Sequence, residues 1–135
     1  MKFGLMTQIQ MPRPWGPGAE RDAFHNAVAQ AAAGEAHGFE YFWITEQHFY
    51  YEIGHCSAPE MVLAAISERT RTLRLGFAVI LVPCHNPFYV AERVATLDVL
   101  SDGRSRIRPG RGPRDRARGD GRDPANVRAG PLFGS

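Results

Sequence analysis

The sequence is poor in cysteine and has no long apolar run. Its two cysteines, Cys56 and Cys84, lie in different motifs without the spacing of a disulfide framework, which fits a reducing compartment. No apolar segment approaches the roughly 20 residues needed to cross a bilayer. The short apolar run after Lys2 is not followed by a small-residue cleavage pattern. We therefore expect no membrane span, no signal peptide and a cytoplasmic location.

Two common cofactor motifs are also missing. No Gly-x-Gly-x-x-Gly follows the first apolar segment, which argues against a Rossmann dinucleotide site. No pair of candidate metal ligands has the C-x2-C or H-x3-H spacing of a zinc site, so no metal site is predicted. The residues considered for such a site are His48, His55, Cys56, Cys84 and His85.

Charge is distributed unevenly along the 135 residues. Residues 1–100 carry seven basic and ten acidic side chains, whereas residues 101–135 carry nine arginines, four aspartates and half of the 14 glycines. With few large apolar residues, this tail has little to contribute to a core. We therefore predict a folded domain over residues 1–104, followed by a low-complexity Arg/Gly/Pro-rich tail over 105–135 that is disordered or translated out of frame.

The arginines of the tail raise the alternative of a nucleic-acid-binding protein, because clustered arginines neutralise phosphates. Four aspartates dilute this charge, and no aromatic residue is interleaved with the arginines before Phe133. Nucleic-acid binding is therefore the less favoured hypothesis.

Strand-like and helix-like patterns alternate through the first hundred residues. Ser57-Ala58-Pro59-Glu60 is typical of a capping box at a helix start, and Asn86-Pro87 suits the N-cap and first position of another helix. The predicted strands are Lys2–Ile9, Phe39–Ile44 and Leu73–Val82, and the predicted helices are Glu20–His37, Ser57–Arg69 and Asn86–Leu100.

This β-α-β-α-β-α order predicts right-handed crossovers and a parallel sheet in an α/β protein. A doubly wound sheet and a (β/α)8 barrel both begin in this way, and the missing dinucleotide motif favours the barrel. A whole barrel takes roughly 250 residues, so the chain would hold the first half of a TIM barrel, about three to four βα units. A fourth strand should follow Gly103, although Arg106, Arg108 and Pro109 are poor choices for a central strand.

The segment Gly38–Phe49 is the best candidate for a functional site. An apolar strand ends there directly in Glu46, Gln47 and His48. Ligands of parallel α/β proteins collect at the carboxyl ends of the strands, which favours a pocket. A polar strand end that simply faces solvent is the alternative.

Taken in order, several segments resemble the bacterial luciferase-like family of flavin-dependent monooxygenases. Each segment is weak alone, and their order and spacing carry the resemblance over residues 1–104. The segments are Met1–Leu5, Gly38–Phe49, His55–Glu60, Arg69–Gly76, Asn86-Pro87 and Ala91–Arg104.

The resemblance implies a (β/α)8 barrel that binds reduced FMN, or in one branch the deazaflavin coenzyme F420, at its C-terminal mouth. Its partners would be reduced flavin and a small-molecule substrate, into which one atom of oxygen is inserted. The resemblance implies that Ala78, Val79 and Gly110 bind the cofactor, with a bulged and sometimes cis peptide at Ala78 and Val79. It implies that Glu46 and His48 are catalytic. It also implies that Gln8, Gln47 and Phe49 bind substrate.

The chain departs from the family at two places. The family pattern Glu-His-His-Phe becomes Glu46-Gln47-His48-Phe49, and an amide cannot take up a proton near neutral pH. A base at this edge would therefore be His48. The chain also ends before the second half of the barrel, which in the family carries the flavin phosphate site.

We therefore expect a truncated or frameshifted flavin-dependent monooxygenase that acts on paired donors. The alternative is a catalytically inactive half-barrel whose exposed sheet edges require a partner, as a homodimer or heterodimer.

Overall fold

The computed structural model describes residues 1–51 and 53–110. Four strands and three α-helices alternate, with one short 3-10 helix before the last α-helix. Their order is β1 (Gly4–Thr7), α1 (Ala19–Ala36), β2 (Tyr41–Ile44), α2 (Pro59–Arg69), β3 (Arg74–Ile80), η1 (Val82–Cys84), α3 (Pro87–Leu100) and β4 (Ser105–Pro109).

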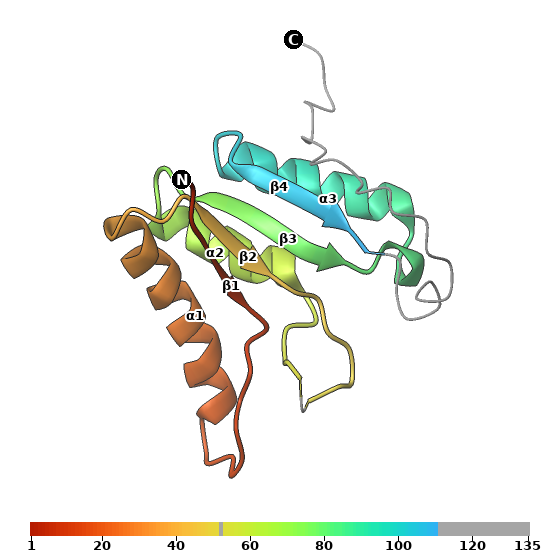
Figure 1. Ribbon diagram of the computed structural model, residues 1–135. Helices are drawn as coiled ribbons and strands as arrows, with labels where there is room; N and C mark the ends of the chain where they lie inside the picture. Colours follow the sequence, from red (N-terminus) through yellow and green to blue (C-terminus); the bar gives the residue numbers. More distant parts are fainter. Residues whose placement is uncertain (52, 111–135) are drawn as a thin grey trace.

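The strands form one parallel sheet in the order β1-β2-β3-β4, so each strand pairs with its neighbour in sequence. Figure 1 shows the three helices along one face of this sheet, and no helix of the described residues lies on the other face. Consecutive parallel strands with their crossover helices on one side are the arrangement of a (β/α)8 barrel, and a doubly wound sheet has helices on both faces. The predicted fold class, the first part of such a barrel, is confirmed.

Alternating side chains on the strands separate the core from the uncovered face. Phe42, Ile44, Leu75 and Phe77 are at most 1% exposed and belong to the core that the helices cover. This burial of apolar area is the main stabilising term of the fold.

The opposite face of β2 and β3 carries an aromatic and cationic layer. The rings of Tyr41 and Trp43 stack with centroids 5.9 Å apart, and the Arg74 guanidinium lies 5.4 Å from the centroid of the Tyr41 ring. Gly76 is required beside Trp43, because a Cβ there would lie 2.1 Å from Cε3 of the indole.

Two helix starts differ in how well the sequence predicted them. Asn86 is the N-cap of α3, and its side chain accepts a hydrogen bond from the Phe88 amide, as predicted. The prediction of a capping box at Ser57 is wrong. Ala58 is the N-cap of α2 and Pro59 is the first helical residue, so no side chain caps the start of this helix. Proline at that position needs no amide partner, which lessens the need for a cap.

The predicted domain boundary after residue 104 falls directly before the fourth strand that we expect after Gly103. Ser105–Pro109 form β4, in parallel register with β3. Ser105 is buried and Ile107 packs against the core, whereas Arg106 and Arg108 alternate onto the face opposite the three helices. The predicted tail over residues 111–135 lies outside the described residues. In the described part of the chain, no helix is long and apolar enough to span a membrane.

Candidate active site

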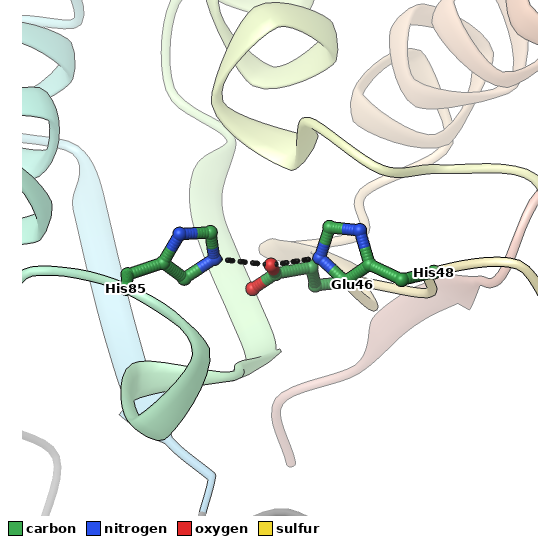
Figure 2. A group of neighbouring side chains, drawn as sticks. All are labelled: Glu46, His48 and His85. Carbon is green, nitrogen blue, oxygen red and sulfur yellow. Dashed lines mark hydrogen bonds and ion pairs between the residues drawn. The ribbon is translucent and has the colours of Figure 1, made fainter.

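Three polar side chains meet at the carboxyl ends of β2 and β3. Nε2 of His48 and Nε2 of His85 each lie 2.5 Å from the same oxygen, Oε1 of Glu46. Figure 2 shows the carboxylate between the two imidazole rings, which approach it from different segments. Glu46 lies two residues after the end of β2, whereas His85 directly follows η1 after β3. We call these three residues the carboxylate–histidine cluster.

Backbone contacts hold Glu46 in this position. Its amide donates to the Val79 carbonyl oxygen at 3.2 Å, and its Oε2 accepts a hydrogen bond of 2.7 Å from the Leu81 amide. The side chain is only 1% exposed, while those of His48 and His85 are 31% and 22% exposed. The carboxylate is therefore buried and anchored, and the two imidazoles lie between it and solvent.

The electrostatics of the cluster favour an ionised Glu46. Burial works to raise the pKa of this carboxyl, but hydrogen bonds from the Leu81 amide, His48 and His85 outweigh it, so the pKa is lowered from 4.5. An ionised carboxylate only accepts hydrogen bonds, so both imidazoles carry a proton on Nε2 in these contacts. In a neutral histidine the remaining nitrogen, Nδ1, is then a free acceptor. The cluster thus fixes which nitrogen of His48 is able to accept a proton.

The three residues assigned to the cofactor also lie together. The peptide bond between Ala78 and Val79 is cis, and the pairing of β3 with β4 shifts register between Ala78 and Ile80. Gly110 donates its amide to the Ile80 carbonyl oxygen at 2.9 Å, and a Cβ at Gly110 would lie 2.3 Å from Cγ2 of Val79. The bulged, cis conformation expected at Ala78 and Val79 is therefore observed, next to Gly110.

The three residues expected to bind substrate differ in their contacts and in their exposure to solvent. Gln8 and Gln47 both approach Gly54, where a Cβ would lie 2.2 Å from the Gln8 carbonyl oxygen and 3.2 Å from Cγ of Gln47. Oε1 of Gln8 is buried and has no hydrogen-bond partner among the described residues. Phe49 is 89% exposed with a φ of 55°, and its ring centroid lies 6.4 Å from that of His48.

Sequence reasoning missed two members of this edge. His85 completes the cluster around Glu46, and Thr45 has a buried Oγ1 without a partner. The spacing of His85 from the other candidate ligands fits no metal motif, so the sequence alone does not predict its contact with Glu46. The rule that polar residues after neighbouring parallel strands meet at one edge is the signal that would have found it.

Comparisons with known proteins identify the family of this chain. The family model described as luciferase-like monooxygenase matches residues 1–130. A 4-hydroxyprotoasukamycin monooxygenase of Streptomyces nodosus subsp. asukaensis is 43% identical over 75 residues, which are 56% of this chain and 20% of that protein.

Two solved structures show the same fold. The oxygenating constituent of 3,6-diketocamphane monooxygenase from Pseudomonas putida, in complex with FMN, superposes with a TM-score of 0.76 at 21% identity, covering 84% of this chain and 30% of that chain. The coenzyme F420-dependent tetrahydromethanopterin reductase of Methanopyrus kandleri gives a TM-score of 0.65 at 24% identity over 84% of this chain and 28% of that one. The chain thus spans about a third or less of these proteins. From the family-model match, together with a parallel sheet whose carboxyl edge carries a buried glutamate and two histidines, we conclude that the chain belongs to the luciferase-like monooxygenase family.

Proposed function

We propose that the carboxyl edge of the sheet is the substrate side of a flavin-dependent monooxygenase site, with FMN as cofactor and coenzyme F420 as the alternative. The observation that carries this proposal is the carboxylate–histidine cluster. It holds His48 with Nδ1 free to accept a proton, and the Glu46 amide links it directly to Val79. Family membership and the FMN and F420 named for the two solved structures support the choice of cofactor.

The residues at this edge suit the ring system of a flavin. A flat, largely apolar ring packs well on small or apolar side chains, and Ala78 follows Gly76 on the uncovered face of β3. Two buried oxygens, Oε1 of Gln8 and Oγ1 of Thr45, have no hydrogen-bond partner in the part of the chain that the structure describes. Buried polar atoms are normally satisfied, so these two are suited to pair with a ligand. On this proposal, Ala78, Val79 and Gly110 contact the cofactor, and Gln8, Gln47 and Phe49 contact the substrate.

The protein groups would then contribute binding and proton transfer. Reduced flavin, when bound, supplies the electrons for oxygen activation, so flavin and substrate are the paired donors. His48 accepts a proton from the substrate at Nδ1. Glu46 fixes the ring orientation through Nε2 and stabilises the imidazolium that forms. Gln47 offers a hydrogen bond but no base.

Flavin binding by the full 135-residue protein tests the proposal. FMN and F420 are titrated separately while the fluorescence of each is followed. We expect micromolar binding of one cofactor. The variant Ala78→Leu should weaken it on the order of tenfold by filling the space for the ring, about 1.4 kcal/mol. Ala91→Leu, on the exposed face of α3, is the matched control and should bind like the wild type.

Two outcomes would contradict this reading. Absence of binding for both cofactors would favour the inactive half-barrel, and equal effects of the two alanine substitutions would remove Ala78 from the site. His48→Gln should leave flavin affinity unchanged, because His48 is assigned to the substrate side.

Two further features stay proposals. A cytoplasmic location agrees with the free thiols of Cys56 and Cys84. A homodimer or heterodimer that covers the exposed sheet edges is a prediction that sedimentation of the purified protein would test.

A further inference from the structure

The carboxylate–histidine cluster brings together three atoms that are able to bind a metal ion. One oxygen of Glu46 and one nitrogen each of His48 and His85 lie within 4.8 Å of one another. Figure 2 shows both nitrogens directed at the carboxylate, with the two rings on opposite sides of it. Because His85 comes from a different loop from Glu46 and His48, the meeting of all three side chains is a property of the folded chain that residue spacing does not reveal.

We propose that Glu46, His48 and His85 form a binding site for a divalent transition-metal ion, with Zn2+ as the preferred ion. Two imidazole nitrogens and one carboxylate oxygen are a common three-ligand set for zinc, with a fourth position open to water. Imidazole ligands favour Zn2+, Co2+ and Ni2+ over Mg2+ and Ca2+, which prefer sets made of oxygen. This inference concerns metal binding alone and does not rest on the proposed flavin chemistry.

The surroundings of the three residues suit such an ion. Glu46 is buried, and its Oε2 is engaged by the Leu81 amide, which orients Oε1 toward the histidines. This is the outer-shell support that metal-binding carboxylates usually have. The 31% and 22% exposure of the histidine side chains gives the ion a path from solvent.

Binding requires a small opening of the cluster. Metal–ligand bonds of about 2.0–2.1 Å place two ligand atoms of a tetrahedral site roughly 3.3 Å apart. The present N–O distances of 2.5 Å must therefore lengthen by somewhat under 1 Å. Side-chain rotation is sufficient for this, since both histidines lie in loops. Coordination through Nε2 also moves each imidazole proton to Nδ1 by way of solvent, so a bound ion would remove the free acceptor of His48.

Cys84 is the main competing ligand in this region. It is exposed and directly precedes His85, and a thiolate binds Zn2+ strongly. No thiol belongs to the proposed ligand set, so the substitution Cys84→Ser separates the two possibilities.

Metal titration of the full-length protein tests the site. Zn2+ affinity is measured by competition with a chromophoric chelator, and Co2+ is followed by its visible absorption. We expect one equivalent of Zn2+ or Co2+ and no response to Mg2+. His48→Gln and His85→Gln should each weaken Zn2+ binding at least about tenfold. His25→Gln, which removes an exposed histidine of α1, and Cys84→Ser should bind like the wild type.

Circular dichroism and the unfolding midpoint of each variant establish that it is folded. The proposal is overturned by absence of Zn2+ binding to the wild type, by wild-type affinity in His48→Gln or His85→Gln, or by loss of binding in Cys84→Ser alone.

Discussion

Glu35 and Glu46 lie at opposite ends of the same sheet, and each accepts several hydrogen bonds. Glu35, near the end of α1, accepts from the backbone amides of Arg71, Thr72 and Leu73 at 2.6–3.1 Å and from the Thr72 hydroxyl at 3.0 Å. Glu46 accepts from one backbone amide and two imidazoles. The first carboxylate binds rigid backbone, whereas the second binds side chains that reach solvent.

Hydrogen bonding around the two glutamates shows the same contrast between the two ends of the sheet. At the amino end of the strands, the Arg104 side chain donates to the carbonyl oxygens of Ser67, Leu73 and Ser101 and to the Thr70 hydroxyl. At the carboxyl edge, polar atoms of Gln8 and Thr45 are buried without a partner. Parallel α/β barrels use the amino end of the sheet for stability and the carboxyl end for ligands, and the hydrogen bonding at the two ends of this sheet agrees with that division.

The largest expected effect is the loss of the amino-end carboxylate. Glu35→Ala leaves three successive backbone amides without their acceptor, and hydrogen bonds to a charged group contribute about 1.5–3 kcal/mol. The site is partly exposed, so solvent screening reduces the sum of these contributions. We therefore expect a decrease of about 3 kcal/mol in the free energy of unfolding, measured by urea denaturation. Glu92→Ala, on the exposed side of α3, is the control and should change stability by under about 0.5 kcal/mol. A similar cost for both variants would contradict the role of Glu35.

A methyl group in the middle of the sheet tests how closely the uncovered face is packed. Gly76→Ala places a Cβ 2.1 Å from the Trp43 ring, so the indole must move, at a cost of about 1–3 kcal/mol. The emission maximum of tryptophan should shift together with the unfolding midpoint. Gly16→Ala meets no atom within 4 Å and serves as the matched control. An unchanged midpoint in Gly76→Ala would show that Trp43 moves freely.

Breaking the carboxyl edge should cost less stability. His85→Gln removes one hydrogen bond to Glu46 from a side chain that is 22% exposed, while Leu81 and His48 remain bonded. We expect a decrease of about 1 kcal/mol in the free energy of unfolding by the same denaturation assay. A decrease in the free energy of unfolding equal to that of Glu35→Ala would show that the two ends of the sheet contribute equally to stability.

The smallest effect is a change with pH. Burial works to raise the pKa of Glu35, but hydrogen bonds from Thr72, Leu73 and Arg71 outweigh it, and the pKa is lowered from 4.5. A carboxyl whose pKa is lower in the folded state stabilises the protein above its unfolded pKa and loses this contribution as the pH falls through the folded value. The stability difference between wild type and Glu35→Gln should therefore shrink as the pH falls from 7 to below 4.5. A constant difference would mean that the charge of Glu35 is unimportant.

The sequence predicted the elements well because their signals are local. Apolar periodicity located all three helices, and Asn86-Pro87 marked the start of α3. It predicted β4 poorly, since Arg106 and Arg108 are unfavourable only if both faces of a central strand are covered. Two of the three cluster residues, Glu46 and His48, were predicted together because they are two residues apart, but His85 reaches them through tertiary structure that no spacing reveals.

The pairing of each strand only with its neighbour in sequence has a consequence for synthesis on the ribosome. As each βα unit emerges, its strand finds its partner already present, so the sheet is able to grow in one direction during translation. Glu46 and His48 emerge with the second unit, whereas the Leu81 amide and His85 emerge one unit later. A nascent chain that has passed β2 but not η1 would carry a glutamate without two of its three partners. The carboxylate–histidine cluster is thus completed only when β3, η1 and His85 have been synthesised, before α3 and β4 follow.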